Sequence, residues 1–209
     1  MDRESIKRYN QSHGDSRKIN LNSVPEPFIG DPESAKVILL SLNPGDSERD
    51  AKAHLHDEFR RAMFHNLHHE SQDWPFYSLN PNFAWTGAGR WWAPRTRELR
   101  LSAGLDHGTL ARRLLVIEWF PYHSKKSSLP TKPVCESQKY SFQLAKEMLE
   151  KKKLVVGMRS RKHWAEVDDH FREVPFLKNP QCGYISRGNA GGDLFDRMVE
   201  ALKSCGCTQ

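Results

Sequence analysis

The sequence lacks any apolar run long enough to cross a membrane. Its longest runs, Val37–Leu40 and Leu114–Ile117, have the length of strands, whereas a membrane-spanning helix needs about 20 apolar residues. The first residues, Met1 to Ser5, also lack the apolar core of a signal peptide. These absences argue against a membrane or secreted protein. We expect a cytoplasmic protein, associated with the nucleoid if its source is bacterial.

Cysteine is scarce as well. The 209 residues include 4 cysteines, at positions 135, 182, 205 and 207, and their spacing fits neither a disulfide framework nor a paired C-x-x-C metal site. The 12 prolines and 13 glycines are too few for a low-complexity chain. The composition is therefore that of a globular protein from a reducing compartment, and the length suits one α/β domain.

Signals for metals and cofactors are also weak. No Gly-rich loop that would cradle a phosphate is present, and His65 and His69 lack the intervening glutamate of a zincin helix. We expect neither a metal nor a cofactor. Charge is in modest positive excess, because 32 lysines and arginines face 26 aspartates and glutamates, a net charge of +6. That balance is compatible with a polyanionic partner but does not establish one.

Four apolar runs predict strands, and charged amphipathic segments between them predict helices. The strands are expected at Lys36–Leu42, Leu114–Ile117, Leu154–Gly157 and, more weakly, Val174–Leu177. The helices are expected over 47–69, 94–103, 137–153, 160–171 and 192–203. This alternation predicts an α/β fold, a three-layer α/β/α sandwich around a short, mostly parallel central sheet. We expect an N-terminal arm over 1–24, a single domain over 25–204 and a tail over 205–209.

Polar turns follow three of the predicted strands. They are Asn43-Pro44-Gly45, the segment that begins at Glu118, and Asn179-Pro180-Gln181. In open α/β sheets ligands bind beyond the carboxyl ends of the strands. The repeated Asn-Pro turn therefore marks the most informative positions of the chain.

Four pieces of the sequence carry a resemblance to a known family. In chain order they are Leu42-Asn43-Pro44-Gly45; Trp74-Pro75-Phe76, followed by Gly89-Arg90-Trp91-Trp92; Glu118-Trp119-Phe120-Pro121; and Asn179-Pro180-Gln181. Together they resemble the uracil-DNA glycosylase superfamily, from about Val24 to Leu202. The similarity is greatest to the branches with an Asn-Pro-Gly motif, of which this chain would be a divergent member.

The resemblance implies a uracil-DNA glycosylase-like fold and a monofunctional DNA glycosylase of base-excision repair. Such an enzyme hydrolyses the N-glycosidic bond of a flipped-out damaged base, uracil above all. In that role Asn43 positions the attacking water and Asn179 stabilises negative charge on the base O2. Phe76 stacks on the base and Glu118 reads its edge. The base pocket is completed by Leu42, Pro44 and Gly45.

Glu118 departs from the family, where an asparagine amide is expected to read uracil. An amide both donates and accepts, whereas an ionised carboxylate only accepts and would repel O4 of uracil. A protonated Glu118 can serve both groups, and burial favours protonation by raising the pKa of the carboxyl. Alternatively Glu118 accepts from an exocyclic amino group, as on cytosine, or pairs with an arginine such as Arg112 or Arg113.

The resemblance also implies DNA, single- or double-stranded, as the partner of a monomeric protein. Tyr184 or Ile185 would act as the wedge that fills the vacated stack. Further contacts with DNA are expected from Arg90, His123, Lys125 and Arg187.

These residues also have plain structural interpretations. Asn43 can be a turn residue whose side chain caps the backbone, Phe76 a core aromatic, and Tyr184 a residue packed on the sheet edge. Two other functions stay open. The same pocket can hold a nucleobase or nucleic acid without cleaving it, or it can belong to a hydrolase of small modified nucleosides, with the segment 47–69 closing over it.

Overall fold

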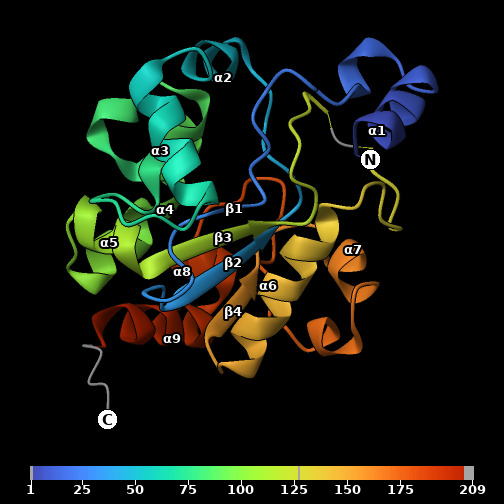
Figure 1. The fold of residues 1–209 in the computed structure, drawn as a ribbon. Helices are drawn as coiled ribbons and strands as arrows, with labels where there is room; N and C mark the ends of the chain where they lie inside the picture. The colour runs from blue at the N-terminus through green and yellow to red at the C-terminus, as the bar shows by residue number, and fades with distance from the viewer. Residues whose placement is uncertain (1, 127, 205–209) are drawn as a thin grey trace.

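The computed structural model describes residues 2–126 and 128–204, and it has a mixed four-stranded sheet at its centre (Figure 1). The strand order is β1-β3-β2-β4. Strands β2 (Val37–Ser41), β3 (Leu114–Glu118) and β4 (Leu154–Gly157) run parallel, and β1 (Phe28–Ile29) pairs antiparallel with β3. The protein is thus an α/β protein. The expected tail over 205–209, with two of the four cysteines, lies outside the described residues.

The register of the parallel strands aligns their carboxyl ends. Val37 on β2 is paired with Leu114 on β3 and with Leu154 on β4. Four residues later, Ser41 is paired with Glu118. The last residue of β3 therefore lies beside the last residue of β2, directly before the Asn-Pro-Gly turn.

The three parallel strands were predictable because each is a continuous apolar run buried on both faces. The predicted fourth strand at 174–177 is wrong. Only Phe176 bridges Gly157, and Pro175 has no N–H to donate to a ladder. Strand β1 was not predicted, because two residues carry no periodicity.

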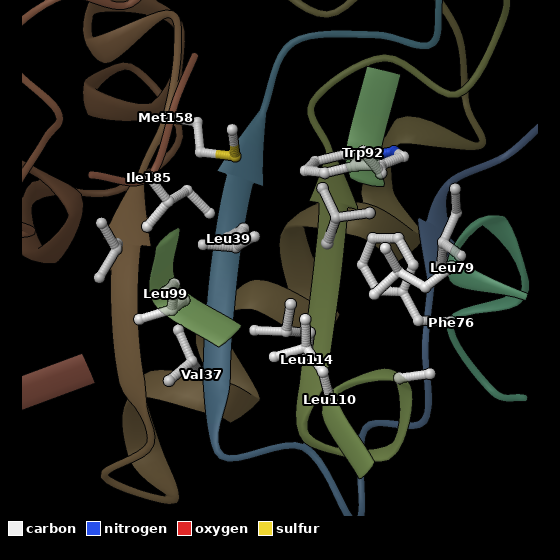
Figure 2. Close-up of a cluster of buried hydrophobic side chains, with 14 of the residues drawn as sticks. Val37, Leu39, Phe76, Leu79, Trp92, Leu99, Leu110, Leu114, Met158 and Ile185 are labelled. Atoms are coloured by element: carbon white, nitrogen blue, oxygen red, sulfur yellow. The ribbon is translucent and has the colours of Figure 1, made fainter. Parts of the chain in front are cut away.

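Alternate residues of β2 and β3 enter two separate cores. Val37 and Leu39 pack on one face of the sheet, and Ile38 and Leu40 on the other. The first face is covered by helices α3 (Asp57–Leu67), α4 (Gly87–Ala103), α5 (His107–Arg113) and α9 (Gly192–Lys203). The second is covered by α6 (Gln138–Glu150), α7 (Arg161–Ala165) and α1 (Asp2–Gln11). Figure 2 shows part of the first core, including Phe76 and Trp92.

The shorter elements complete the chain. These are η1 (Asp15–Arg17), η2 (Tyr77–Leu79), η3 (Pro81–Phe83), η4 (Asp169–Arg172) and α8 (Arg187–Ala190). The segment 1–24 was expected to be an N-terminal arm, but residues 2–11 form α1, whose Ile6 is buried in the second core. Within the described ranges, no helix combines the length and apolar character that crossing a membrane requires.

The single helix predicted over 47–69 is interrupted. A capping box between Ser47 and Asp50 begins α2 (Glu48–Ala53), and α3 starts afresh at Asp57. At the break His54 is buried, whereas the apolar Leu55 is 78% exposed. The inward contacts of His54 described below thus override the helical periodicity.

Helix α4 begins earlier than predicted. The helix was expected to start at Pro94, but it begins at Gly87, and Thr86 caps it, its hydroxyl accepting from the Gly89 N–H. Pro94 lies inside the helix, where it removes one backbone hydrogen bond, and Trp92 and Leu99 bury the helix face on either side of it. The predicted stop at Gly104 is confirmed, with φ of 69°. The segment 160–171 is divided between α7 and η4, whereas α9 agrees with its prediction.

Gly30 provides a test of how closely β1 packs against β3. It follows β1 with φ of 121°, and an added Cβ would lie 2.4 Å from the carbonyl oxygen of Leu114. We expect Gly30→Ala to lower the free energy of unfolding by about 2–3 kcal/mol, measured by urea denaturation. Gly14→Ala is the matched control, since nothing lies within 4 Å of its added Cβ. Equal losses in both variants would contradict the close approach of β1 to β3.

Candidate functional site

A cavity of about 920 Å³ lies beyond the carboxyl ends of β2 and β3. Its wall combines the turn at 43–45, the end of β3, the segment 123–126, the start of α4 and the break between α2 and α3. The lining residues used below are Glu26, Asn43, Trp91, Glu118, His123 and Arg159. A smaller cavity of about 460 Å³ lies beside β4 around Lys152–Val155, at the amino-terminal end of that strand. The larger cavity is where the sheet topology predicts a ligand.

The side chain of Asn43 is fixed in one orientation. Its Nδ2 atom lies 3.0 Å from the Pro44 carbonyl oxygen, 3.2 Å from that of Tyr122 and 2.9 Å from Ser124 Oγ. Three acceptors around one atom identify it as the nitrogen of the amide. Among the described residues no donor reaches Oδ1, so the carboxamide presents a free acceptor.

The loop after β3 clamps the Asn-Pro-Gly turn. The Ser124 N–H donates to the Pro44 carbonyl at 3.3 Å, and Gly45 forms a bridge with Ser124. His123 Nδ1 lies 2.6 Å from the Gly45 carbonyl oxygen, which requires a proton on Nδ1. The turn is therefore held by backbone and side-chain contacts at all three of its residues.

A buried ionic cluster lies behind this loop. Glu26 Oε1 is 3.1 Å from His123 Nε2 and 3.6 Å from His54 Nε2, and Glu26 Oε2 accepts from the Tyr77 hydroxyl at 2.8 Å. Burial alone would lower the pKa of His123, but the contact with Glu26 outweighs it and raises the pKa to about 9. Burial acts the other way on Glu26, whose pKa the two histidines hold well below its ordinary value. The pair is charged at neutral pH.

The same cluster has the composition of a metal site. The ligand atoms of Glu26, His54 and His123 all lie within 4.8 Å of one another. However, the Val24 N–H donates to His54 Nδ1 at 3.2 Å, so that in a neutral ring the proton is on Nε2, the atom that would have to bind the metal. The hydrogen bonding therefore fits an ion pair with a histidine donor better than a metal centre. His65 and His69 lie elsewhere, beside Glu70 and Tyr140 respectively.

Glu118 is a second buried carboxyl in the cavity wall. It is 4% exposed, and its Oε2 atom has no hydrogen-bond partner in the described part of the chain. Burial and the charge of Glu26 raise the pKa of Glu118 to about 8, against the opposing effects of Ser41, Arg159 and His123. At neutral pH the carboxyl is therefore protonated, with one donor and one acceptor.

The aromatic residues that line the cavity differ from the one expected, Phe76. Phe76 has no exposed surface and does not line the cavity. Its ring is nearly perpendicular to that of Trp92, with the two ring centroids 5.2 Å apart, and both side chains belong to the core shown in Figure 2. Trp91 and Trp92 line the cavity, and Trp91 stacks under Arg95 at 3.3 Å. Phe76 thus supports the wall from the core, and its location argues against direct stacking on a ligand.

The second Asn-Pro turn reaches the cavity through other residues than expected. Pro180 and Gln181 line it, whereas Asn179 is exposed and outside the lining. The Asn179 Oδ1 atom accepts from the backbone N–H groups of Gln181 and Cys182 at 3.0 and 3.4 Å. Its side chain is thereby engaged in its own turn, which argues against contact with the base.

The residues expected to contact DNA are dispersed. His123 and Lys125 line the cavity, together with Leu42, Pro44 and Gly45 of the expected base pocket. Arg90 is exposed on α4 outside the lining, and Arg187 is paired with Asp196, with Nη1 and Oδ2 3.0 Å apart. Ile185 is fully buried and cannot be a wedge as it stands, whereas Tyr184 is 44% exposed.

Several site residues escaped the sequence analysis. Glu26 precedes a two-residue strand, and His54 fell inside a predicted helix. Their meeting with His123 depends on contacts across 69 to 97 positions, for which one sequence contains no local signal. Arg159, which follows β4, is a further lining residue that the polar turns of the sequence did not single out.

Comparison with known proteins adds no relative. No family model, curated protein or solved structure matches this chain. The assignment of a function therefore depends on the geometry of the cavity.

If Glu118 is neutral, the free energy of unfolding of the unaltered protein should fall with pH relative to that of Glu118→Gln. Its pKa is about 8 when folded against an ordinary value of 4.5, so unfolding between these values releases a proton. The stability contribution of the protonated form is complete below pH 4.5 and is lost as the pH rises through 8. Relative to Glu118→Gln, the protein should lose up to about 1.4 kcal/mol per pH unit in that window. Urea denaturation from pH 5 to 8 measures it, and parallel curves for the two proteins would refute a neutral Glu118.

Proposed function

We propose that this protein is a DNA glycosylase that hydrolyses the N-glycosidic bond of a base rotated out of DNA into the cavity. One observation carries the proposal: a free amide acceptor on Asn43 and a buried, unpartnered carboxyl on Glu118 line one cavity at adjacent strand ends. The sheet with helices on both faces and the polar turns at its carboxyl edge support the likeness to the uracil-DNA glycosylase superfamily, with its α/β/α layering.

Asn43 positions the water in this reaction. Its Oδ1 atom accepts a hydrogen bond from the water and aims the water oxygen at C1′ of the sugar, while its Nδ2 atom stays bound to the surrounding loop. An amide does not remove a proton, so the gain comes from orientation and from the electrostatic surroundings. The His123 imidazolium, charged by its contact with Glu26, places a positive charge beside the cavity where negative charge develops on the base.

Glu118 recognises the edge of the base. A protonated carboxyl donates through its O–H and accepts through its carbonyl oxygen. This pair complements a ring carbonyl beside a ring N–H, as on uracil, hypoxanthine and xanthine. Trp91 and Trp92, and not Phe76, bring aromatic rings to the cavity wall, and a base that stacks on such a ring gains roughly 1–3 kcal/mol.

The rim of the cavity suits a DNA strand. Lys125, Lys126 and Arg159 line it and can neutralise phosphates. Leu55 directly follows His54, which lines the cavity, and it is 78% exposed. An apolar side chain at that place can enter the stack left by the extruded base. Leu55 thus replaces Ile185 as the candidate wedge.

A hydrolase of small modified nucleosides is the second candidate. Asp50, His54 and Phe59 bring α2 and α3 into the cavity wall, as a cover over a small ligand would require. Turnover of free nucleosides without turnover of oligonucleotides would favour this function. Binding of a base without any turnover would instead favour a non-catalytic nucleobase-binding module.

Asn43→Ala tests the catalytic role of the turn. Single-turnover excision from oligonucleotides that contain uracil, hypoxanthine or xanthine, followed by alkaline cleavage, should give abasic product with the unaltered protein. The variant should be slower by about 100-fold or more, because the water loses its acceptor. Asn82→Ala, an exposed asparagine on η3, should keep full activity. Absence of product from all three bases would end the glycosylase proposal.

Leu55→Ala tests the wedge. We expect excision from duplex DNA to fall about tenfold or more, since unstacking costs a few kcal/mol that the wedge helps to offset. Excision from single-stranded DNA should hardly change. Leu101→Ala removes an equally apolar side chain that is 56% exposed near the end of α4, and it should leave both rates intact. A uniform loss on both substrates would exclude a wedge at Leu55.

A further inference from the structure

Glu118 has properties that base recognition alone does not require. A glutamine or asparagine amide would donate and accept at the same place without the desolvation of a carboxyl. Glu118 is instead a carboxyl, 4% exposed, at the end of a central strand, with Oε2 unpartnered at the cavity. Unlike an amide, a neutral carboxyl has a proton that it can transfer.

We propose that Glu118 is the general acid of this site and transfers its proton to the departing base. The inference rests on the proposed glycosylase function and extends it. The substrates it favours are bases with a carbonyl oxygen or ring nitrogen facing Glu118, which leave as neutral heterocycles and not as anions.

The step balances as an ordinary hydrolysis. As the C1′–N bond breaks, its electron pair goes to the base, and the Glu118 proton goes to the heteroatom of the base that faces it. The oxygen of the water held by Asn43 bonds to C1′ and releases one proton to solvent. The Glu118 carboxylate then regains a proton from solvent. Each turnover consumes one water and gives one free base and one abasic sugar; the proton that Glu118 takes up replaces the proton that the water released, so no further reactant is needed.

Three other polar residues near Glu118 in the cavity wall are less suited to this step. Glu26 is ionised, with contacts to Tyr77, His54 and His123. His123 donates from Nδ1 to the Gly45 carbonyl, and its Nε2 atom, which has no hydrogen-bond partner of good geometry among the described residues, lies 3.1 Å from Glu26 Oε1. The negative charge of Glu26 therefore holds the proton on this ring. Asn43 has no proton to give at neutral pH.

Burial and the nearby charges together set the protonation of Glu118 at neutral pH. The groups that act on it are Glu26, from the segment before β1, the Tyr77 hydroxyl on η2, and the positively charged His123 and Arg159 from the loops after β3 and β4. Burial is the largest effect, and the pKa of Glu118 rises to about 8. A rate that depends on this proton should be level below pH 8 and fall about tenfold per unit above it.

Glu118→Gln separates recognition from proton transfer, because glutamine still donates and accepts but has no acidic proton. The substrates are oligonucleotides with uracil or 5-fluorouracil, whose electron-withdrawing fluorine makes the anion a better leaving group. We expect single-turnover excision of uracil to fall 100-fold or more, and that of 5-fluorouracil to fall at least tenfold less. Binding of uncleaved oligonucleotide should stay within about threefold. Glu150→Gln, at the exposed end of α6, is the matched control and should be unaffected.

The possible outcomes distinguish the general-acid role of Glu118 from the glycosylase function itself. Equal losses on the two substrates, or no loss on either, would overturn the general acid and leave the glycosylase function standing. An unaltered protein that excises none of the bases would overturn both. If the variant fails to fold, the profile of the unaltered protein provides the test: a fall above pH 8 for uracil that is shallower for 5-fluorouracil supports the general acid, and identical profiles refute it.

Discussion

The structure of the cavity depends on the buried ion pair between Glu26 and His123. It fixes a positive ring against the backbone of Gly45 and so holds the Asn-Pro-Gly turn in place. The negative charge of Glu26 also adds to the effect of burial on a second carboxyl, Glu118, and together they raise the pKa of Glu118 so that it keeps its proton. Breaking a buried pair by removing one partner typically costs 3–5 kcal/mol, so this arrangement is part of the fold as well as of the site.

Two carboxyls in one cavity therefore have opposite protonation states. Glu26 is charged because Tyr77 and two histidines face it. Glu118 is neutral because burial disfavours its charged form and its Oε2 atom has no donor among the described residues to offset that burial. Groups whose surroundings separate their pKa values are the usual sign of an acid and its electrostatic partner. On this account Glu118 supplies the proton, and Glu26 acts through His123 as a positioning residue.

The sequence alone was enough to predict the features that a local residue pattern determines. The three parallel strands are continuous apolar runs, and the carboxyl-end rule led from them to Asn43 and Glu118. It did not predict what depends on distant contacts. Phe76 and Trp92 are both apolar, and only their packing decides that the tryptophan reaches the cavity. Asn179 satisfies its own turn, and His54 ends a helix because Glu26, 28 positions earlier in the chain, attracts it.

The most direct measurement of the central claim is a carbon-13 NMR titration of the Glu118 side-chain carboxyl, assigned by its disappearance in Glu118→Gln. The account predicts a protonated carboxyl at pH 7 and a midpoint near pH 8. A midpoint near the ordinary value of 4.5 would contradict it, because an ionised Glu118 would neither donate to a base carbonyl nor protonate a leaving base.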